Sequence, residues 1–154
     1  MEISSTQTSR LVIDASLAVW AVVPAIAPFD TLALIRGWRE ENVQLLSPSL
    51  FLSESTSAIR RLVHGGLISA EEGTNALTDL LDLAVDIIQE NDEHCRAAFR
   101  WAELLDQAKA YDGVYLAVAE ESGIELWTAD ECLARSAQVR NIDWVRWVGQ
   151  IHTV

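Results

Sequence analysis

Four acidic residues that are far apart in the chain each stand at the edge of an apolar segment. They are Asp14, Glu54, Asp112 and Asp130. Asp14 follows the apolar run 11–13 and Asp130 follows the run 124–128, so both are expected where a buried strand gives way to a helix. The other two lie on apolar helical stretches. An ionised carboxylate is costly to bury unless a positive group meets it, so four at the edge of one core indicate a shared counter-ion, most simply a divalent metal.

Some of these residues also have a purely structural interpretation. Asp112 opens the apolar segment 111–119 and is suited to cap a helix there, which uses one carboxylate oxygen and leaves the other free for a metal. Thr128 to Glu131 matches a capping box, in which Asp130 would be only a favourable charge in the first helical turn. Asp14 has no basic neighbour among the apolar residues around it, so a functional interpretation is favoured there.

Helical geometry gives Glu54 a defined direction. One apolar stripe of its helix is formed by Phe51, Ser55, Ala58 and Leu62. Glu54 lies at the margin of this stripe, Arg61 lies within about 20° of Glu54 around the helix axis, and Arg60 points away. The Glu54 and Arg61 pair is therefore either a metal ligand beside a phosphate contact or a weak, solvated charge pair at the boundary of the core.

The elements that must position these residues alternate between strand and helix. Strands are expected at 11–15, 43–47, 85–89, 124–128 and 142–148. Helices are expected at 29–41, from Ser47-Pro48 to Gly65-Gly66, from a capping box at Ser69 and Glu72 to about Val85, and at 92–109, 112–121 and 131–137. Apolar turns with Pro24 and Pro28 are expected before the first helix.

This alternation predicts an α/β fold, a three-layer sandwich with a central, mostly parallel sheet of about five strands. Ligands of such sheets bind at the carboxyl ends of the strands, where Asp14 and Asp130 are expected. No linker or repeat divides the 154 residues, so we expect one domain over 1–154, with its core at about 11–148.

The charge of the chain limits its partners. With 11 basic and 23 acidic residues the formal net charge is -12, which argues against unaided binding to a polyanion. A bound metal would reverse the sign locally, and the bases are almost all arginine, which suits phosphate contacts. The only lysine, Lys109, is expected with Arg96 and Arg100 on a solvated helix face.

Other features of composition indicate a cytoplasmic location. The longest apolar stretch, 11–29, is interrupted by an aspartate and two prolines, so no membrane span or signal peptide is expected. Cys95 and Cys132 have neither metal-ligand spacing nor the density of a disulfide scaffold, and their expected role is packing in a reducing compartment. The histidines are isolated in the sequence, which disfavours a histidine-based mechanism. The tryptophans are expected in the core.

Four segments carry a resemblance to a known family. They are 11–16, 47–54, 110–117 and 126–130, and they contain the four acidic residues in order. Together they resemble the acidic motifs of PIN-domain ribonucleases, and in particular those of VapC-type toxins. The resemblance implies that Asp14, Glu54, Asp112 and Asp130 are catalytic and surround Mg²⁺ or Mn²⁺. It places Ser16 and Thr128 at hydroxyl positions near the site, and it implies a homodimer and a small antitoxin that covers the site.

The leading hypothesis is thus a metal-dependent endoribonuclease, the toxin of a type II toxin-antitoxin pair. Hard carboxylate oxygens select Mg²⁺ or Mn²⁺, which activate water for phosphodiester hydrolysis, and Arg61 is the candidate phosphate contact. The alternative is a catalytically weak PIN-like module that binds metal and a protein partner, motivated by the charge. A phospho-acceptor receiver domain would need a late lysine at a strand end, and a haloacid-dehalogenase-like phosphatase would need an aspartate where Ser16 stands.

Overall fold

Five strands form the centre of the molecule. The computed structural model of the chain describes residues 9–152. The strands are β1 (Arg10–Ile13), β2 (Gln44–Pro48), β3 (Asp86–Ile88), β4 (Glu125–Thr128) and β5 (Val145–Trp147). They form one sheet in the order β3-β2-β1-β4-β5, and every neighbouring pair is parallel. Leu11 pairs with Leu45 of β2 and with Glu125 of β4, so β1 lies at the centre of the sheet.

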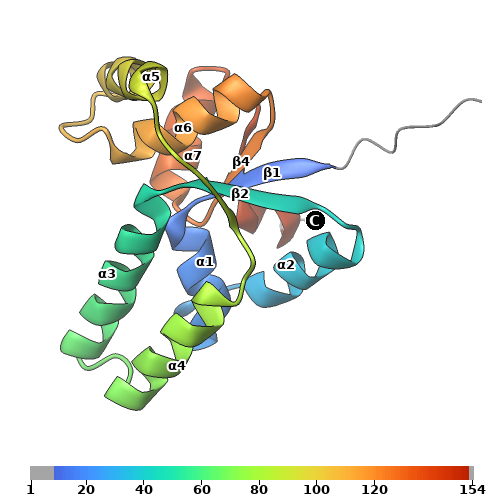
Figure 1. The fold of residues 1–154 in the computed structure, drawn as a ribbon, viewed down its shortest axis with the longest axis vertical. Helices are drawn as coiled ribbons and strands as arrows, with labels where there is room; N and C mark the ends of the chain where they lie inside the picture. Colours follow the sequence, from blue (N-terminus) through green and yellow to red (C-terminus); the bar gives the residue numbers. More distant parts are fainter. Residues whose placement is uncertain (1–8, 153–154) are drawn as a thin grey trace, which may run out of the picture.

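Helices cover both faces of this sheet. They are α1 (Ala15–Val22), the 3₁₀ turn η1 (Pro24–Ile26), α2 (Thr31–Glu40), α3 (Leu50–His64), α4 (Ala70–Leu81), α5 (Asp92–Leu104), α6 (Tyr111–Ser122), α7 (Glu131–Val139) and the 3₁₀ turn η2 (Val148–His152). Figure 1 shows α1 to α4 on one side of the strands and α5 and α6 on the other. The connection from β3 to β4 runs back across the sheet, and a right-handed crossover then places its helices on the opposite face. The expected α/β three-layer sandwich is confirmed.

The strands at the centre of the sheet are buried on both faces. Val12, Ile13 and Leu126 are fully buried, and so are Leu116 and Ala119 of α6, which packs over β1, β2 and β4. Continuous apolar runs of this kind are typical of parallel strands. None of the helices within residues 9–152 is long and apolar enough to cross a membrane. The ends of the expected domain, residues 1–8 and 153–154, lie outside the described residues.

Helix α1 stands where turns are expected from the sequence. Its residues, 15–22, are apolar on nearly every side, so they lack the alternation that identifies a surface helix. Asp14 is its N-cap, and the carboxylate oxygen Oδ1 accepts the N–H of Leu17 at 3.0 Å. The expected position of Asp14, where a buried strand gives way to a helix, is therefore correct, whereas the apolar turns expected after this strand are wrong over 15–22.

The start of α3 also differs from the prediction. Ser47 and Pro48 are the last residues of β2, and α3 begins at Leu50. Ser47 does not cap a helix, because its hydroxyl donates to a carbonyl at the end of β1 at 2.7 Å. The helix start is held from outside instead. The hydroxyl of Ser49 and the N–H of Leu50 both donate to Glu90, which follows β3, the second at 3.2 Å.

Helix α5 is shorter than the expected segment 92–109. It ends at Leu104, and Asp106 has a left-handed backbone with φ 54°. The N–H of Gln107 then donates to the carbonyl of Ala102 at 2.8 Å, the bonding pattern of a Schellman helix end. The chain continues as a loop to α6, which removes Lys109 from the helix on which it was expected. The last strand is likewise shorter than predicted and gives way to η2.

Helix α6, which carries Asp112, lies very close to α5. A Cβ atom at Gly113 would lie 2.4 Å from the backbone oxygen of Ala98, a distance that real Cβ atoms essentially never show. Glycine is therefore required here by the close approach of two backbones. The other end of α6 is a left-handed Gly123, which ends the helix as predicted.

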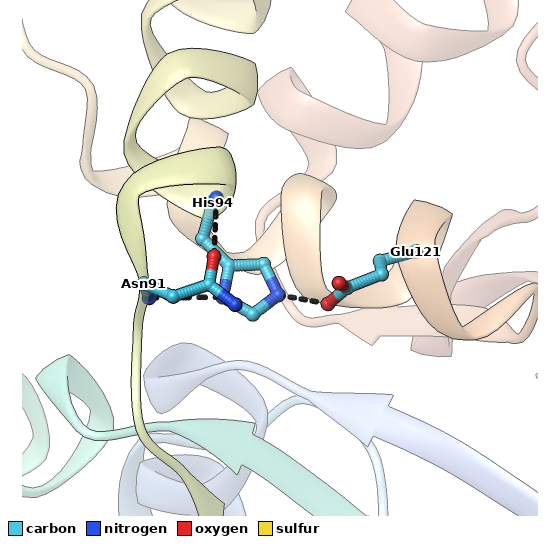
Figure 2. A network of polar contacts seen from close by, with 3 residues as sticks. All are labelled: Asn91, His94 and Glu121. Carbon is cyan, nitrogen blue, oxygen red and sulfur yellow. Dashed lines mark hydrogen bonds and ion pairs between the residues drawn. The ribbon is translucent and has the colours of Figure 1, made fainter.

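A buried histidine joins the start of α5 to the end of α6 (Figure 2). His94 Nδ1 accepts the N–H of Asn91 at 3.2 Å, and Nε2 contacts the carboxylate of Glu121. Because Nδ1 accepts a hydrogen bond, the proton of the neutral ring is on Nε2, which donates it to Glu121. His94 is thus not isolated in the fold. Its contacts fix α6 from the end opposite to Asp112.

The capping box of Ser69 and Glu72 is confirmed. Both cysteines are exposed, so the packing role expected for them is wrong. The tryptophans are only partly buried, and they pack against the margin of the core.

Candidate active site

Asp14 is held by donors from the first turn of α1 and from the end of β4. Its side chain is buried, and Oδ1 accepts the hydroxyl of Ser16 at 2.7 Å in addition to the N–H of Leu17. Oδ2 accepts the hydroxyl of Thr128, the last residue of β4. Thr128 Oγ1 also accepts the N–H of Asp130 at 2.9 Å. The two hydroxyl residues expected near the site, Ser16 and Thr128, therefore both orient Asp14 directly.

The surroundings of Asp14 are unfavourable for its charge. Burial raises the pKa of Asp14 from 3.8 to about 6, while the hydrogen bonds from Thr128 and Ser16 partly oppose the shift. The nearby carboxylate of Asp112 raises the pKa further. A carboxylate with hydrogen-bond donors but no cation beside it gains the most from a cation that comes close.

Glu54 on α3 and Asp112 on α6 line the same groove. The hydroxyl of the buried Tyr115 donates to Glu54 Oε1 at 3.4 Å, and Gln107 Nε2 donates to Asp112 Oδ2 at 2.8 Å. Asp112 is in the first turn of α6 and does not cap it, because the N-cap is Ala110. The capping role considered from the sequence is therefore wrong.

Asp112 is the carboxylate that connects the other three electrostatically. Burial is the largest cause of the raised pKa of Asp14, of Glu54 and of Asp112 itself. Repulsion from Asp112 adds to the shifts of Asp14 and Glu54, and repulsion from Asp130 adds to that of Asp112. The four residues thus meet at one edge of the sheet, close enough for their charges to oppose one another.

Asp130 is the outermost member of this group. It is exposed and is the N-cap of α7, where Oδ1 accepts the N–H of Leu133 at 3.1 Å. The capping box predicted from Thr128 to Glu131 is wrong, since Thr128 ends β4 and its hydroxyl is used on Asp14. Asp130 is therefore both a helix cap and a charge at the site.

The groove has a volume of about 760 Å³ and runs between α3 and the loop that precedes α6. Arg61 lines it on the α3 side and lowers the pKa of Glu54, although burial and Asp112 outweigh this effect. Arg60 faces a different groove, between α3 and α4, so the directions predicted for the two arginines are correct. Lys109 lines the wall opposite Arg61, and its expected place on a solvated helix face is wrong.

The carboxylate oxygens of the site are chemically suited to bind a divalent cation. As the side chains stand, no three His, Cys, Asp or Glu side chains within residues 9–152 are grouped to hold an ion. Mg²⁺ does not need such a cage, because it usually keeps several waters and binds one or two carboxylates. Asp14 and Asp112, with Glu54 across the groove, supply hard oxygen atoms of the kind that Mg²⁺ and Mn²⁺ prefer. These residues fit a hydrated ion.

Three residues of the site were not found from the sequence. Tyr115 and Gln107 donate to Glu54 and Asp112, and Tyr111 lines the groove beside Asp112. Tyr115 is a core residue with 1% of its surface exposed, so its apolar surroundings in the sequence do not indicate a role at the site. The position of Gln107 depends on the turn at Asp106, for which the sequence has no glycine signal.

Comparison with known proteins places this arrangement in a family. Residues 11–139 match the family model described as PIN domain. The chain belongs to the PIN domain family. PIN domains are generally nucleases, and PIN nucleases generally use divalent metals. No curated protein matches this PIN domain in sequence.

Solved structures share the fold of this PIN domain at low sequence identity. PAE2754 from Pyrobaculum aerophilum has a TM-score of 0.66 and 18% identity, over 97% of this chain and 92% of the other. VapBC2 from Rickettsia felis, solved bound to a DNA fragment from its promoter, has a TM-score of 0.58 and 13% identity, over 90% and 96%. Mycobacterium tuberculosis VapC20, described as a toxin that cleaves the sarcin-ricin loop, has a TM-score of 0.54 and 17% identity, over 81% and 94%.

Proposed function

We propose that this PIN domain is a Mg²⁺- or Mn²⁺-dependent endoribonuclease that hydrolyses RNA phosphodiester bonds. Its catalytic and metal-binding residues would be Asp14, Glu54, Asp112 and Asp130. The observation that carries the proposal is the meeting of these four carboxylates around Asp112, with raised pKa values at three of them and few cations beside them. A protein gains nothing in stability from such a cluster, so a bound cation is its simplest explanation.

Each side chain has a defined part in this proposal. A bound divalent cation supplies Lewis acidity and an activated water. Asp14 presents a carboxylate whose direction is fixed by Ser16, Leu17 and Thr128, so little reorganisation is needed when an ion binds. Glu54 and Asp112 face the groove in which the RNA backbone would lie, and Arg61 would contact a phosphate there.

We further propose that the chain is the toxin of a type II toxin-antitoxin pair. The similarity in fold to VapBC2 and VapC20 supports this class. It implies a small antitoxin as the protein partner, a homodimer as the assembly and the cytoplasm as the location. Co-expression with the product of the adjacent reading frame, followed by co-purification, tests the partner.

The test of the activity is cleavage of a labelled structured RNA with Mn²⁺ and with excess chelator. We expect cleavage only with the metal, and a loss of more than about 100-fold in Asp14→Asn and Asp112→Asn, because even the partners of metal ligands typically contribute about 10- to 100-fold. Asp79→Asn, an exposed aspartate on α4, is the matched control and should cleave like the wild type. Undiminished wild-type cleavage in chelator would refute the proposal.

The net charge of -12 favours a second candidate, a PIN-like module that binds metal and a protein partner but cleaves poorly. Titration calorimetry with Mn²⁺ separates the two. Metal binding that depends on Asp14 and Asp112, without cleavage of ribosomal, transfer or messenger RNA, supports the module. Metal-dependent cleavage supports the nuclease.

A further inference from the structure

The groove beside the carboxylates differs in charge from the rest of the protein. The whole chain has a formal charge of -12, but the groove is lined by two acidic residues, Glu54 and Asp112, and by two basic ones, Arg61 and Lys109. The groove lining is thus neutral before any metal binds. A polyanion approaching this acidic protein meets less repulsion at this groove than the net charge of the chain implies.

The two basic residues stand on opposite walls. Arg61 is seven residues after Glu54 on α3, which places it roughly 10 Å along the helix axis from the acidic end of the groove. Lys109 comes from the loop before α6, and both side chains are exposed. Phosphates of one strand that leaves the carboxylates along the groove would therefore pass between two cations.

An exposed aromatic ring stands directly beside the carboxylates. Tyr111 is the first residue of α6, precedes Asp112 and lines the same groove, with 54% of its surface exposed. Among the large apolar side chains described as exposed, only one other is aromatic, Phe99 on α5, and it does not line the groove. An exposed tyrosine ring is costly to hydrate, and its flat face is suited to stack on a nucleobase.

We propose that Tyr111 is the stacking platform for an unpaired nucleotide next to the bond that is cut, and that Arg61 and Lys109 hold the phosphates on that side. The inference rests on the proposed ribonuclease function and adds a specificity determinant to it. A base inside a duplex has both faces covered by its neighbours, so a ring at this position selects an unpaired base. The groove volume of about 760 Å³ is in the range of sites for drug-sized ligands, enough for a short piece of a single strand.

The test is fluorescence anisotropy with a labelled 12-nucleotide single-stranded RNA and with a duplex of the same sequence. All proteins carry Asp112→Asn and are measured in excess chelator, so that binding is observed without metal and without cleavage. In this background Tyr111→Ala should raise Kd for the single strand by roughly 5- to 150-fold, the range of one stacked base. Tyr111→Phe should bind within about twofold, because the ring is kept.

Matched controls separate stacking from loss of fold. Phe99→Ala removes the other exposed aromatic ring and should leave Kd unchanged, and thermal unfolding verifies that each variant folds. Arg61→Ala and Lys109→Ala should each reduce the slope of log Kd against log salt by about 0.7, the value for one phosphate contact on a single strand. Arg60→Ala, on the other side of α3, should not change the slope.

The outcomes decide the inference independently of the nuclease assay. Equal Kd values for Tyr111→Ala and Phe99→Ala overturn it, and so does Tyr111→Phe binding as weakly as Tyr111→Ala. Preference for the duplex, or no measurable binding of the single strand by the Asp112→Asn protein, also overturns it. If the wild type cleaves RNA but Tyr111 does not matter, the proposed function stands and this inference fails. If Tyr111 governs binding but the wild type cleaves no RNA, this inference stands and the proposed function fails.

Discussion

Removal of the charge of Asp14 should stabilise the metal-free protein. Burial raises the pKa of this carboxyl from 3.8 to about 6, so the folded state binds the proton more tightly than the unfolded state. Between about pH 4 and pH 6, unfolding therefore releases a proton, and the free energy of unfolding falls as the pH rises. A shift of about two pKa units at about 1.4 kcal/mol each amounts to about 3 kcal/mol lost by neutral pH.

The new amide side chain of the Asp14→Asn variant can keep nearly all of the hydrogen bonds. Its oxygen accepts from Ser16 and Leu17 as before, and its NH₂ group donates to Thr128, whose hydroxyl turns to donate to Ser16 Oγ, 3.2 Å away. Rearranging one hydrogen bond costs about 1 kcal/mol. We therefore expect the variant to be more stable than the wild type by about 2 kcal/mol at pH 7.5.

The assay is urea unfolding in chelator, followed by tryptophan fluorescence, from pH 4 to pH 8. The difference between variant and wild type should be near zero or slightly negative at pH 4 and should grow up to about pH 6 to 7. Thr128→Val is a useful companion, because removing a donor to the carboxylate should raise the pKa of Asp14 further and extend the loss of stability to higher pH. A difference that is independent of pH, or an Asp14→Asn variant that is less stable at neutral pH, would refute the reasoning.

Three further predictions concern metal and backbone packing. Mg²⁺ at about 100 times its dissociation constant should stabilise the wild type by about 2.7 kcal/mol and should leave the melting temperature of Asp14→Asn unchanged in calorimetry. Gly113→Ala should lower the free energy of unfolding by about 1–3 kcal/mol or more, because the added Cβ would lie 2.4 Å from the backbone oxygen of Ala98. Unchanged stability in urea would contradict the close approach of α5 and α6. Gly37→Ala, inside α2 with nothing within 4 Å of the new Cβ, should raise stability by about 0.5–1 kcal/mol in the same assay, and a decrease would show an unrecognised contact.

Local sequence signals predict the parts of the fold that local physics determines. Continuous apolar runs predict the buried strands. The residue types alone predict the capping box at Ser69 and the helix end at Gly123. Asp14 stands out because no neighbour in the sequence neutralises it. These features need only a few adjacent residues to be recognised.

The remaining differences arise from contacts between distant segments. Helix α1 is apolar on nearly every side, so its sequence has no polar face from which a helical period could be recognised. The start of α3 is held by Glu90 from another strand, and Thr128 turns its hydroxyl to Asp14 instead of capping a helix. The end of α5 depends on a left-handed aspartate, Asp106, and this turn brings Lys109 and the loop to the groove. None of these interactions leaves a signal at a fixed spacing.

The central claim is that the clustered carboxylates hold the divalent cation for RNA cleavage, and crystals soaked in Mn²⁺ test it most directly. We expect an anomalous peak at the carboxyl ends of the central strands, about 2.1 Å from an oxygen of Asp14 or Asp112, and its absence from crystals of Asp112→Asn. No peak among the four carboxylates at saturating Mn²⁺, or a peak held entirely by residues elsewhere, would contradict it.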